Sequence, residues 1–192
     1  LVATNDDRVI KVLDAFTKGR LYWRKSDKKV IFAQKSGSVY ILTDPLTAAE
    51  IGQVKKGTLK KIRVNNRLRK KIRGVLGGLT LLSKNPEIRA KAAEAVFKSR
   101  IATVLPLLEK AIARETVSNI KIKMEMARAA IQLASAETVE TRLAAIKFLS
   151  AQAVPQVRSL LSNIVNTEKD ISVKKAATEA LEEIEDSLAF WN

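Results

Sequence analysis

The segment from Lys55 to Arg73 is the part of the sequence whose residue types point most clearly to a binding activity. Ten of its nineteen residues are Lys or Arg, and none is Asp or Glu. Because a buried charge without a partner is very costly, these side chains are expected to face water, an anionic surface or an acidic partner. The predicted binding residues are Lys55, Lys56, Lys60, Lys61, Arg63, Arg67, Arg69, Lys70, Lys71 and Arg73. The alternative interpretation is a solvated basic face that is balanced by acidic groups elsewhere.

The residue types that perform most enzymatic chemistry are missing from the chain. It has no Cys and no His, which removes the usual zinc and haem ligands, thiol nucleophiles and the Ser-His-Asp triad. The remaining acid and base candidates are carboxylates, and most of them fall on helix faces that the pattern predicts to be exposed, such as Glu182, Glu183, Glu185 and Asp186. We therefore expect a protein that is not an enzyme, with no catalytic residues, no cofactor and no metal site.

The overall charge indicates which classes of partner to consider. The net charge is +15 and the isoelectric point is near 10.1, and such values favour nucleic acid, anionic lipid or an acidic protein surface. Tyr22 and Trp23, close to Arg20, Arg24 and Lys25, are candidates for stacking on bases, but aromatic residues in a short sheet more often belong to its core. Charge alone does not choose among these partners.

The first sixty residues predict a short helix followed by a small antiparallel sheet. Apolar residues recur at helical spacing from Val9 until Gly19, after a capping signal at Asn5 and Asp6. The period then changes to three β-rich runs, separated by Ser-Asp and Ser-Gly turn residues, and a shorter fourth run is possible. These runs are 21–25, 29–34, 38–43 and 50–54. A sheet of three or four strands needs a helix against one face to be stable.

The rest of the chain is helical in period and contains an internal repeat. Asn65 and Asn66 can cap a helix with an apolar stripe, and Gly74, Gly77 and Gly78 suggest close packing of its backbone. A pattern of one basic, one small and two apolar residues recurs near residues 88, 141 and 173, with a degenerate copy near 120. The second and third copies, and likewise the first and the degenerate copy, are 32 residues apart, which is typical of helical hairpins in an α-solenoid. The sequence therefore predicts an α+β chain, mostly α, with the sheet in residues 1–60 and a HEAT-like array in 61–192, as one continuous unit.

Several segments read together resemble one family, the N-terminal extracytoplasmic domain of the permease subunit of urea-type ABC transporters, in the branched-chain amino acid permease class. The most specific element is Val64, Asn65, Asn66, Arg67, Leu68 and Arg69, followed by the GRLY stretch that begins at Gly19. The other segments are 19–32, 40–54, 60–83 and 86–89. The likeness covers nearly the whole chain, and the chain is richer in Lys than is usual for the family.

The resemblance implies a location and a role. The transport path would lie in another part of the protein, and the chain, which begins at Leu1 rather than Met, would be a periplasmic accessory domain with no catalytic or urea-binding residues. Its expected partners are the rest of the permease and its membrane, the solute-binding protein or anionic lipid. The rival hypothesis is a soluble HEAT-like protein that binds nucleic acid through the segment from Lys55 to Arg73.

Overall fold

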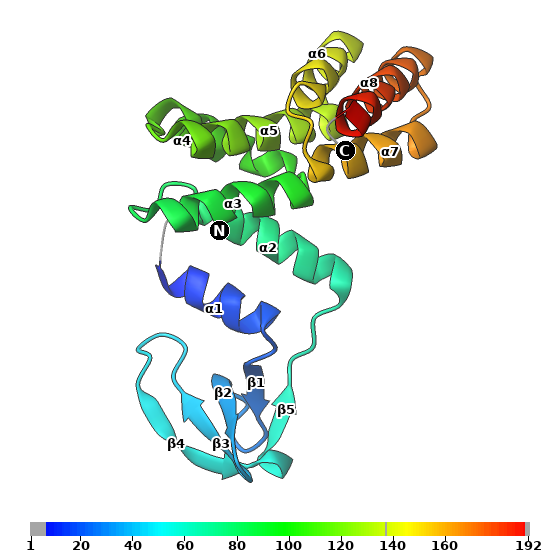
Figure 1. Cartoon of the computed structure of the whole chain (residues 1–192). Helices are drawn as coiled ribbons and strands as arrows, with labels where there is room; N and C mark the ends of the chain where they lie inside the picture. The colour runs from blue at the N-terminus through cyan, green and yellow to red at the C-terminus, as the bar shows by residue number, and fades with distance from the viewer. Residues whose placement is uncertain (1–6, 137, 191–192) are drawn as a thin grey trace. The chain divides into compact units, whose positions relative to one another are not determined.

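The chain forms two compact units in a computed structural model that describes residues 7–136 and 138–190 (Figure 1). The first unit comprises residues 1–80 and the second residues 81–192. The boundary predicted near residue 60 falls inside the basic segment from Lys55 to Arg73. In the structure the whole of this segment lies within the first unit.

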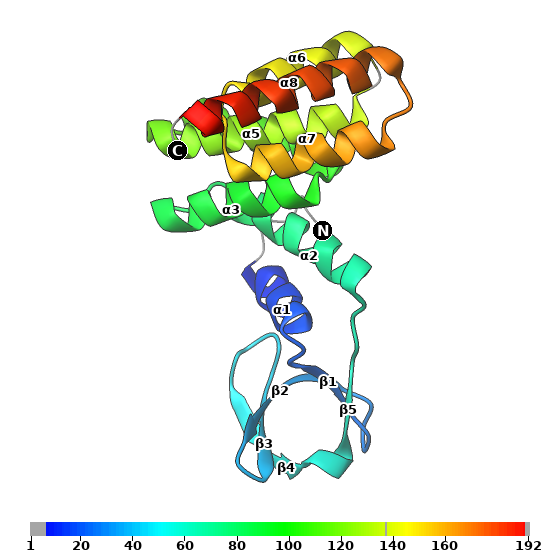
Figure 2. The same cartoon turned by 45° about the vertical axis from the view of Figure 1, so that its right-hand side comes forward.

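The first unit contains a five-stranded antiparallel sheet in the order β4-β3-β2-β1-β5. Its strands are β1 (Leu21–Arg24), β2 (Val30–Ser36), β3 (Val39–Thr43), β4 (Glu50–Lys55) and β5 (Leu59–Lys61), and the 3-10 helix η1 (Lys56–Thr58) joins the last two. Figure 2 shows the strands curling around a common interior. The sheet has one strand more than predicted, because β5 is only three residues long and two of them are lysines that hide its strand pattern.

Alternation along the strands sends one set of side chains into the interior of the curled sheet. Ile31, Ala33, Leu42 and Leu59 are buried there. Tyr22 packs edge-on against Tyr40 with 5.6 Å between ring centroids, which is a favourable geometry for aromatic pairs. Tyr22 is therefore half-buried and packs against this core.

Two helices complete the first unit. The helix α1 (Asp7–Thr17) contacts both β1 and the helix α2 (Asn66–Thr80). The side chain of Asn65 caps α2, because its Oδ1 accepts a hydrogen bond of 2.8 Å from the backbone N–H of Leu68. This confirms the predicted start of the helix, whereas the proposed cap at Asn5 and Asp6 lies outside the described residues.

The described residues of the second unit form six α-helices, with α3 packed on α5, α5 on α6, and both α6 and α7 on α8 (Figures 1 and 2). They are α3 (Pro86–Ser99), α4 (Leu105–Arg114), α5 (Ser118–Ser135), α6 (Val139–Ser150), α7 (Pro155–Thr167) and α8 (Ile171–Phe190), and the 3-10 helix η2 (Ala102–Val104) precedes α4. Their predicted helical character is confirmed. The fold class is thus α+β and mostly helical, with a small antiparallel sheet.

The six helices form two copies of a three-helix arrangement, offset by 53 residues. Arg100 ends α3 with φ 53°, and Ala153, which lies 53 positions later, has φ 46°. Val104 and Val157 are both fully buried and obey the same offset, and several other residues form matching pairs. These pairs are Asn85 and Thr138 as side-chain caps, Arg89 and Arg142, Glu115 and Glu168, Leu108 and Leu161, and Ile131 and Ile184. The 32-residue spacing noted in the sequence relates α3 to α5 and α6 to α8 within each copy.

Candidate anion-binding surface

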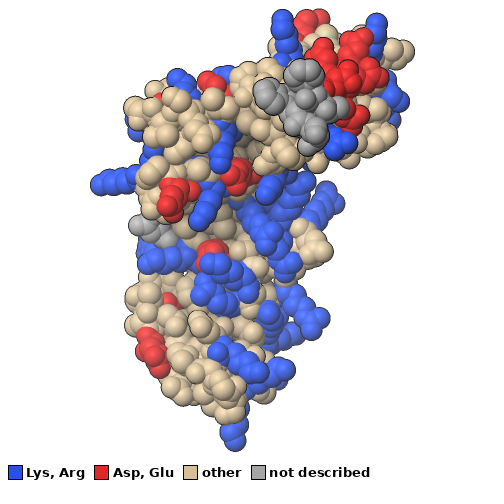
Figure 3. All heavy atoms as spheres, viewed as in Figure 1, with Lys and Arg blue, Asp and Glu red and all other residues tan. Residues whose placement is uncertain are grey.

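The ten predicted binding residues come from five consecutive pieces of the first unit. Lys55 ends β4 and Lys56 begins η1, while Arg63 lies in the connection between β5 and α2. The strand β5 carries Lys60 and Lys61, and the first half of α2 carries Arg67, Arg69, Lys70, Lys71 and Arg73. In Figure 3, Lys and Arg side chains gather along the flank of the first unit formed by β5 and α2.

These side chains are accessible and lack counter-charges among the described residues. Nine of the ten are exposed, and Arg69 is half-buried. No ion pair within residues 7–136 and 138–190 involves any of them. The surface therefore keeps its positive charge in the part of the chain that the structure describes.

Three carboxylates of the first unit have partners outside the ten basic residues. Asp14 pairs with Lys18 and Arg20 at 2.9 Å each. Asp27 pairs with Arg24, and hydrogen bonding to that guanidinium lowers the pKa of Asp27 to about 2. The Asp44 carboxylate accepts backbone hydrogen bonds from the turn that follows it, which lowers its pKa. These groups stabilise local turns rather than the ten basic residues.

The helix α2 concentrates positive charge at its own amino end. Its first turn contains no acidic residue, and the helix dipole adds partial positive charge there. Arg67 and Lys71, like Arg69 and Arg73, are like charges four residues apart, and each such pair costs a few tenths of a kcal/mol, ~0.2–0.5. A bound anion would relieve this repulsion, so the arrangement favours anion binding.

Three of the ten residues, Lys61, Arg63 and Arg69, line one open hollow of about 410 Å³. The other lining residues are Thr17, Lys18, Gly19, Ile62 and Val64. The remaining seven predicted residues lie outside it. Lys60, for example, is next to Lys61 on a strand and so points to the opposite face, where Trp23 lies across from it.

Sequence reasoning did not identify Lys18 as part of this surface. It lies in the turn after α1, and only the pairing of β5 with β1 brings that turn beside the basic segment. The signal in the sequence was Gly19, which ends the predicted helix and so places Lys18 in a turn. Trp23 is 41% exposed, unlike the buried sheet aromatic that was expected.

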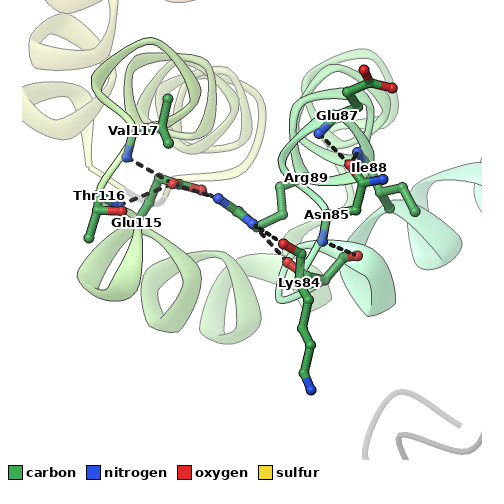
Figure 4. Close-up of polar contacts among 9 residues, drawn as sticks. Lys84, Asn85, Glu87, Ile88, Arg89, Glu115, Thr116 and Val117 are labelled. Carbon is green, nitrogen blue, oxygen red and sulfur yellow. Dashed lines mark hydrogen bonds and ion pairs between the residues drawn. The ribbon is translucent and has the colours of Figure 1, made fainter.

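The second unit has a different electrostatic character, with paired charges that connect its helices. Arg89 donates two hydrogen bonds to the Glu115 carboxylate, at 2.6 and 3.0 Å, and Figure 4 shows this pair joining α3 to the start of α5. Hydrogen bonding to Arg89 lowers the pKa of Glu115, and the N–H groups of Thr116 and Val117 also donate to the carboxylate. With four hydrogen bonds from Arg89 and the two backbone N–H groups, this buried carboxylate is a packing element.

Comparison with family models, curated proteins and solved structures gives no match. Within the described residues, no group of three or more Asp or Glu is placed to hold a metal ion. None of the described helices combines the length and apolar character that crossing a bilayer requires.

Proposed function

We propose that the chain is the extracytoplasmic accessory domain of the permease subunit of an ABC importer for urea or short-chain amides. Its role is docking or assembly at the outer, membrane-facing surface, and not catalysis. The family resemblance around Val64 to Arg69 supports the identity of the transporter, and the charge of the first unit supports the role.

The observation that carries the role is the set of ten Lys and Arg residues without carboxylate partners in the described chain. Each basic residue near an anionic membrane surface contributes roughly 1 kcal/mol. Exposed charges act over a Debye length of about 8 Å at physiological salt, so only residues that approach the surface together contribute fully. The surface formed by β5 and α2 presents several in one place, which is enough for measurable binding.

We further propose that the second unit is a short HEAT-like stack that provides a rigid support. The two three-helix copies, with matching buried residues and matching ion pairs, are the feature that supports this interpretation. Repetition of one packing unit is how α-solenoids extend. The acidic side chains of α8 make this unit a poor candidate for contact with an anionic surface.

Sedimentation with lipid vesicles tests the proposed role. The full chain is mixed with vesicles of equal parts phosphatidylcholine and phosphatidylglycerol, or of phosphatidylcholine alone, at low salt and at high salt. Binding is expected only to the anionic vesicles and is expected to decrease at high salt. A second arm measures binding to the solute-binding protein of the same transporter. Absence of binding to both at low salt would overturn the proposal.

A pair of matched variants assigns the binding to the basic surface. Arg67, Lys70, Lys71 and Arg73 are replaced by Gln in one variant. The control variant carries four Gln substitutions at exposed lysines of the second unit, Lys110, Lys121, Lys147 and Lys174. Both variants lose four positive charges. Vesicle binding that is at least tenfold weaker in the first variant alone supports the proposal. Tighter binding to a single-stranded oligonucleotide than to vesicles would favour the nucleic-acid hypothesis instead.

A further inference from the structure

We infer that the hollow between the α1–β1 turn and the start of α2 binds a phosphate group carried by a larger molecule. This inference rests on the proposed function, because the hollow belongs to the same basic surface. It adds a defined position and a ligand chemistry. The hollow is lined by Lys18, Lys61, Arg63 and Arg69 as its charged residues, and no Asp or Glu is among the lining residues.

Arg69 is held in position before any ligand arrives. Its Nη1 donates to Asn66 Oδ1 at 2.9 Å, and its Nη2 donates to the backbone oxygen of Val64 at 3.5 Å. A guanidinium has five N–H donors, so donors remain for a ligand, and its planar shape suits two oxygens of a phosphate. The half-buried position of Arg69 also reduces the screening of its charge by water.

Gly19 makes room for Lys61 at the edge of the hollow. The backbone of Gly19 has φ +65°, and a Cβ atom built there would lie 2.7 Å from Lys61 Nζ. Lys61 Nζ also lies 5.9 Å from the centroid of the Tyr22 ring, which holds the ammonium group by a cation–π contact. A side chain at position 19 would push the flexible end of Lys61 aside, so Gly19 leaves the space that this ammonium group occupies.

The Asp14 carboxylate, which pairs with Lys18, leaves the other three cations of the hollow without a counter-charge. Asp14 shares its two oxygens between Lys18 and Arg20, at 2.9 Å each. Arg63 is exposed and makes no side-chain hydrogen bond or ion pair with the described residues. Lys61, Arg63 and Arg69 therefore keep three positive charges for a ligand. A phosphate group, which only accepts hydrogen bonds when fully ionised, fits this set of donors.

The size of the hollow indicates the kind of phosphate. A volume of about 410 Å³ falls within the range of ligand pockets, ~300–1,000 Å³, and exceeds what one phosphate ion occupies. The hollow thus has space for the phosphate and for part of the molecule to which it is attached. A phosphomonoester, with its higher charge and three free oxygens, uses three cations better than a phosphodiester does.

The test compares phosphomonoester and phosphodiester surfaces on the full chain. The probes are inorganic phosphate, titrated by calorimetry, and vesicles that contain phosphatidic acid or phosphatidylglycerol at matched surface charge. Preference for phosphatidic acid indicates a lipid headgroup as the source, and saturable binding of inorganic phosphate without that preference indicates a soluble phosphate compound. Either result supports a phosphate site. If the chain shows neither preference for phosphatidic acid nor saturable binding of inorganic phosphate, the inference is overturned.

Variants locate the site. Arg63→Gln and Arg69→Gln are each expected to reduce the phosphate-dependent binding about tenfold, and Gly19→Ala to reduce it without changing the charge. The control is the double variant Lys55→Gln and Lys56→Gln, which removes charge from the same surface outside the hollow. The control is expected to weaken binding to both anionic vesicles equally and to keep the preference. If the control and the hollow variants lose phosphate-dependent binding equally, a defined site is refuted and the docking role remains intact. If the wild-type chain does not bind anionic vesicles at all, both proposals are refuted.

Discussion

The two copies of the three-helix arrangement allow one stability prediction to be tested within a single molecule. Arg89→Ala is expected to lower the free energy of unfolding by about 3 kcal/mol, and Arg142→Ala by only about 1–2 kcal/mol. Both substitutions remove the same partner from the same position. The side chain of Glu115 is 1% exposed, whereas that of Glu168 is 13% exposed. Arg89 also donates to the backbone oxygens of Ser83 and Lys84, and Arg142 donates to that of Leu133, so the predicted difference comes mainly, and not solely, from the burial of the carboxylate.

The magnitudes follow from what each carboxylate keeps after the substitution. Removing one partner of a buried pair costs ~3–5 kcal/mol, because it leaves an uncompensated charge. Glu115 keeps two backbone N–H donors, at 3.1 and 3.0 Å, so its cost belongs at the lower end of that range. Glu168 also keeps two backbone donors, at 2.9 Å each, and water reaches it more easily, which lowers the cost further.

Urea unfolding, monitored by circular dichroism at 222 nm, measures both losses. Hydrogen exchange followed by mass spectrometry then assigns each loss to peptides of α3–α5 or of α6–α8. Arg89→Ala is expected to accelerate exchange where α3 meets α5. Equal destabilisation by the two variants, or a larger loss for Arg142→Ala, would refute the argument that burial determines the cost.

Three further predictions concern pH, backbone conformation and salt. Arg89 lowers the pKa of Glu115 from its ordinary value of 4.5, so the stabilisation by this pair is complete above about pH 4.5 and is lost as the pH falls through the lowered pKa. Glu115→Gln should therefore shrink the difference in unfolding free energy between neutral and acid pH. An unchanged difference would count against this explanation. Ala153→Gly is expected to stabilise the chain by up to ~1 kcal/mol because φ 46° is unfavourable for Ala. Gly37→Ala, at φ 58°, should destabilise the chain by ~1 kcal/mol for the same reason. A lower melting temperature for Ala153→Gly, or a higher one for Gly37→Ala, would contradict this reasoning. Binding to anionic vesicles should weaken steadily with salt concentration, and salt-independent binding would show that charge is not the driving force.

Much of the fold was predictable from local pattern, and the exceptions have physical causes. The alternating strands from Leu21 to Thr43 and the cap at Asn65 correspond to the structure because local residue types determine them. The strand β5 was missed because pairing with β1, and not its own three residues, makes it a strand. The sequence showed the three-helix repeat only in part. Arg100 and Ala153 adopt the matching left-handed conformation at the helix ends, but neither is Gly or Asn, the residues that usually signal such an end in a sequence.

The candidate site was predictable in composition and not in geometry. A segment of nineteen residues with ten basic and no acidic side chains identifies a charged surface from the sequence alone. The convergence of Lys61, Arg63 and Arg69 with Lys18 depends on the pairing of distant strands and on the turn at Gly19. Sequence spacing contains no information of that kind. The role of Asp14 in occupying nearby cations was likewise visible only in three dimensions.

Hydrogen exchange of the full chain, with and without vesicles that contain anionic phospholipid, tests most directly whether the basic surface is the binding surface. We predict slower exchange in peptides that span residues 55–73 and no change in peptides from the acidic helix α8. Protection confined to α8, or to other peptides outside residues 55–73 and the turn at Gly19, would contradict the proposed docking surface.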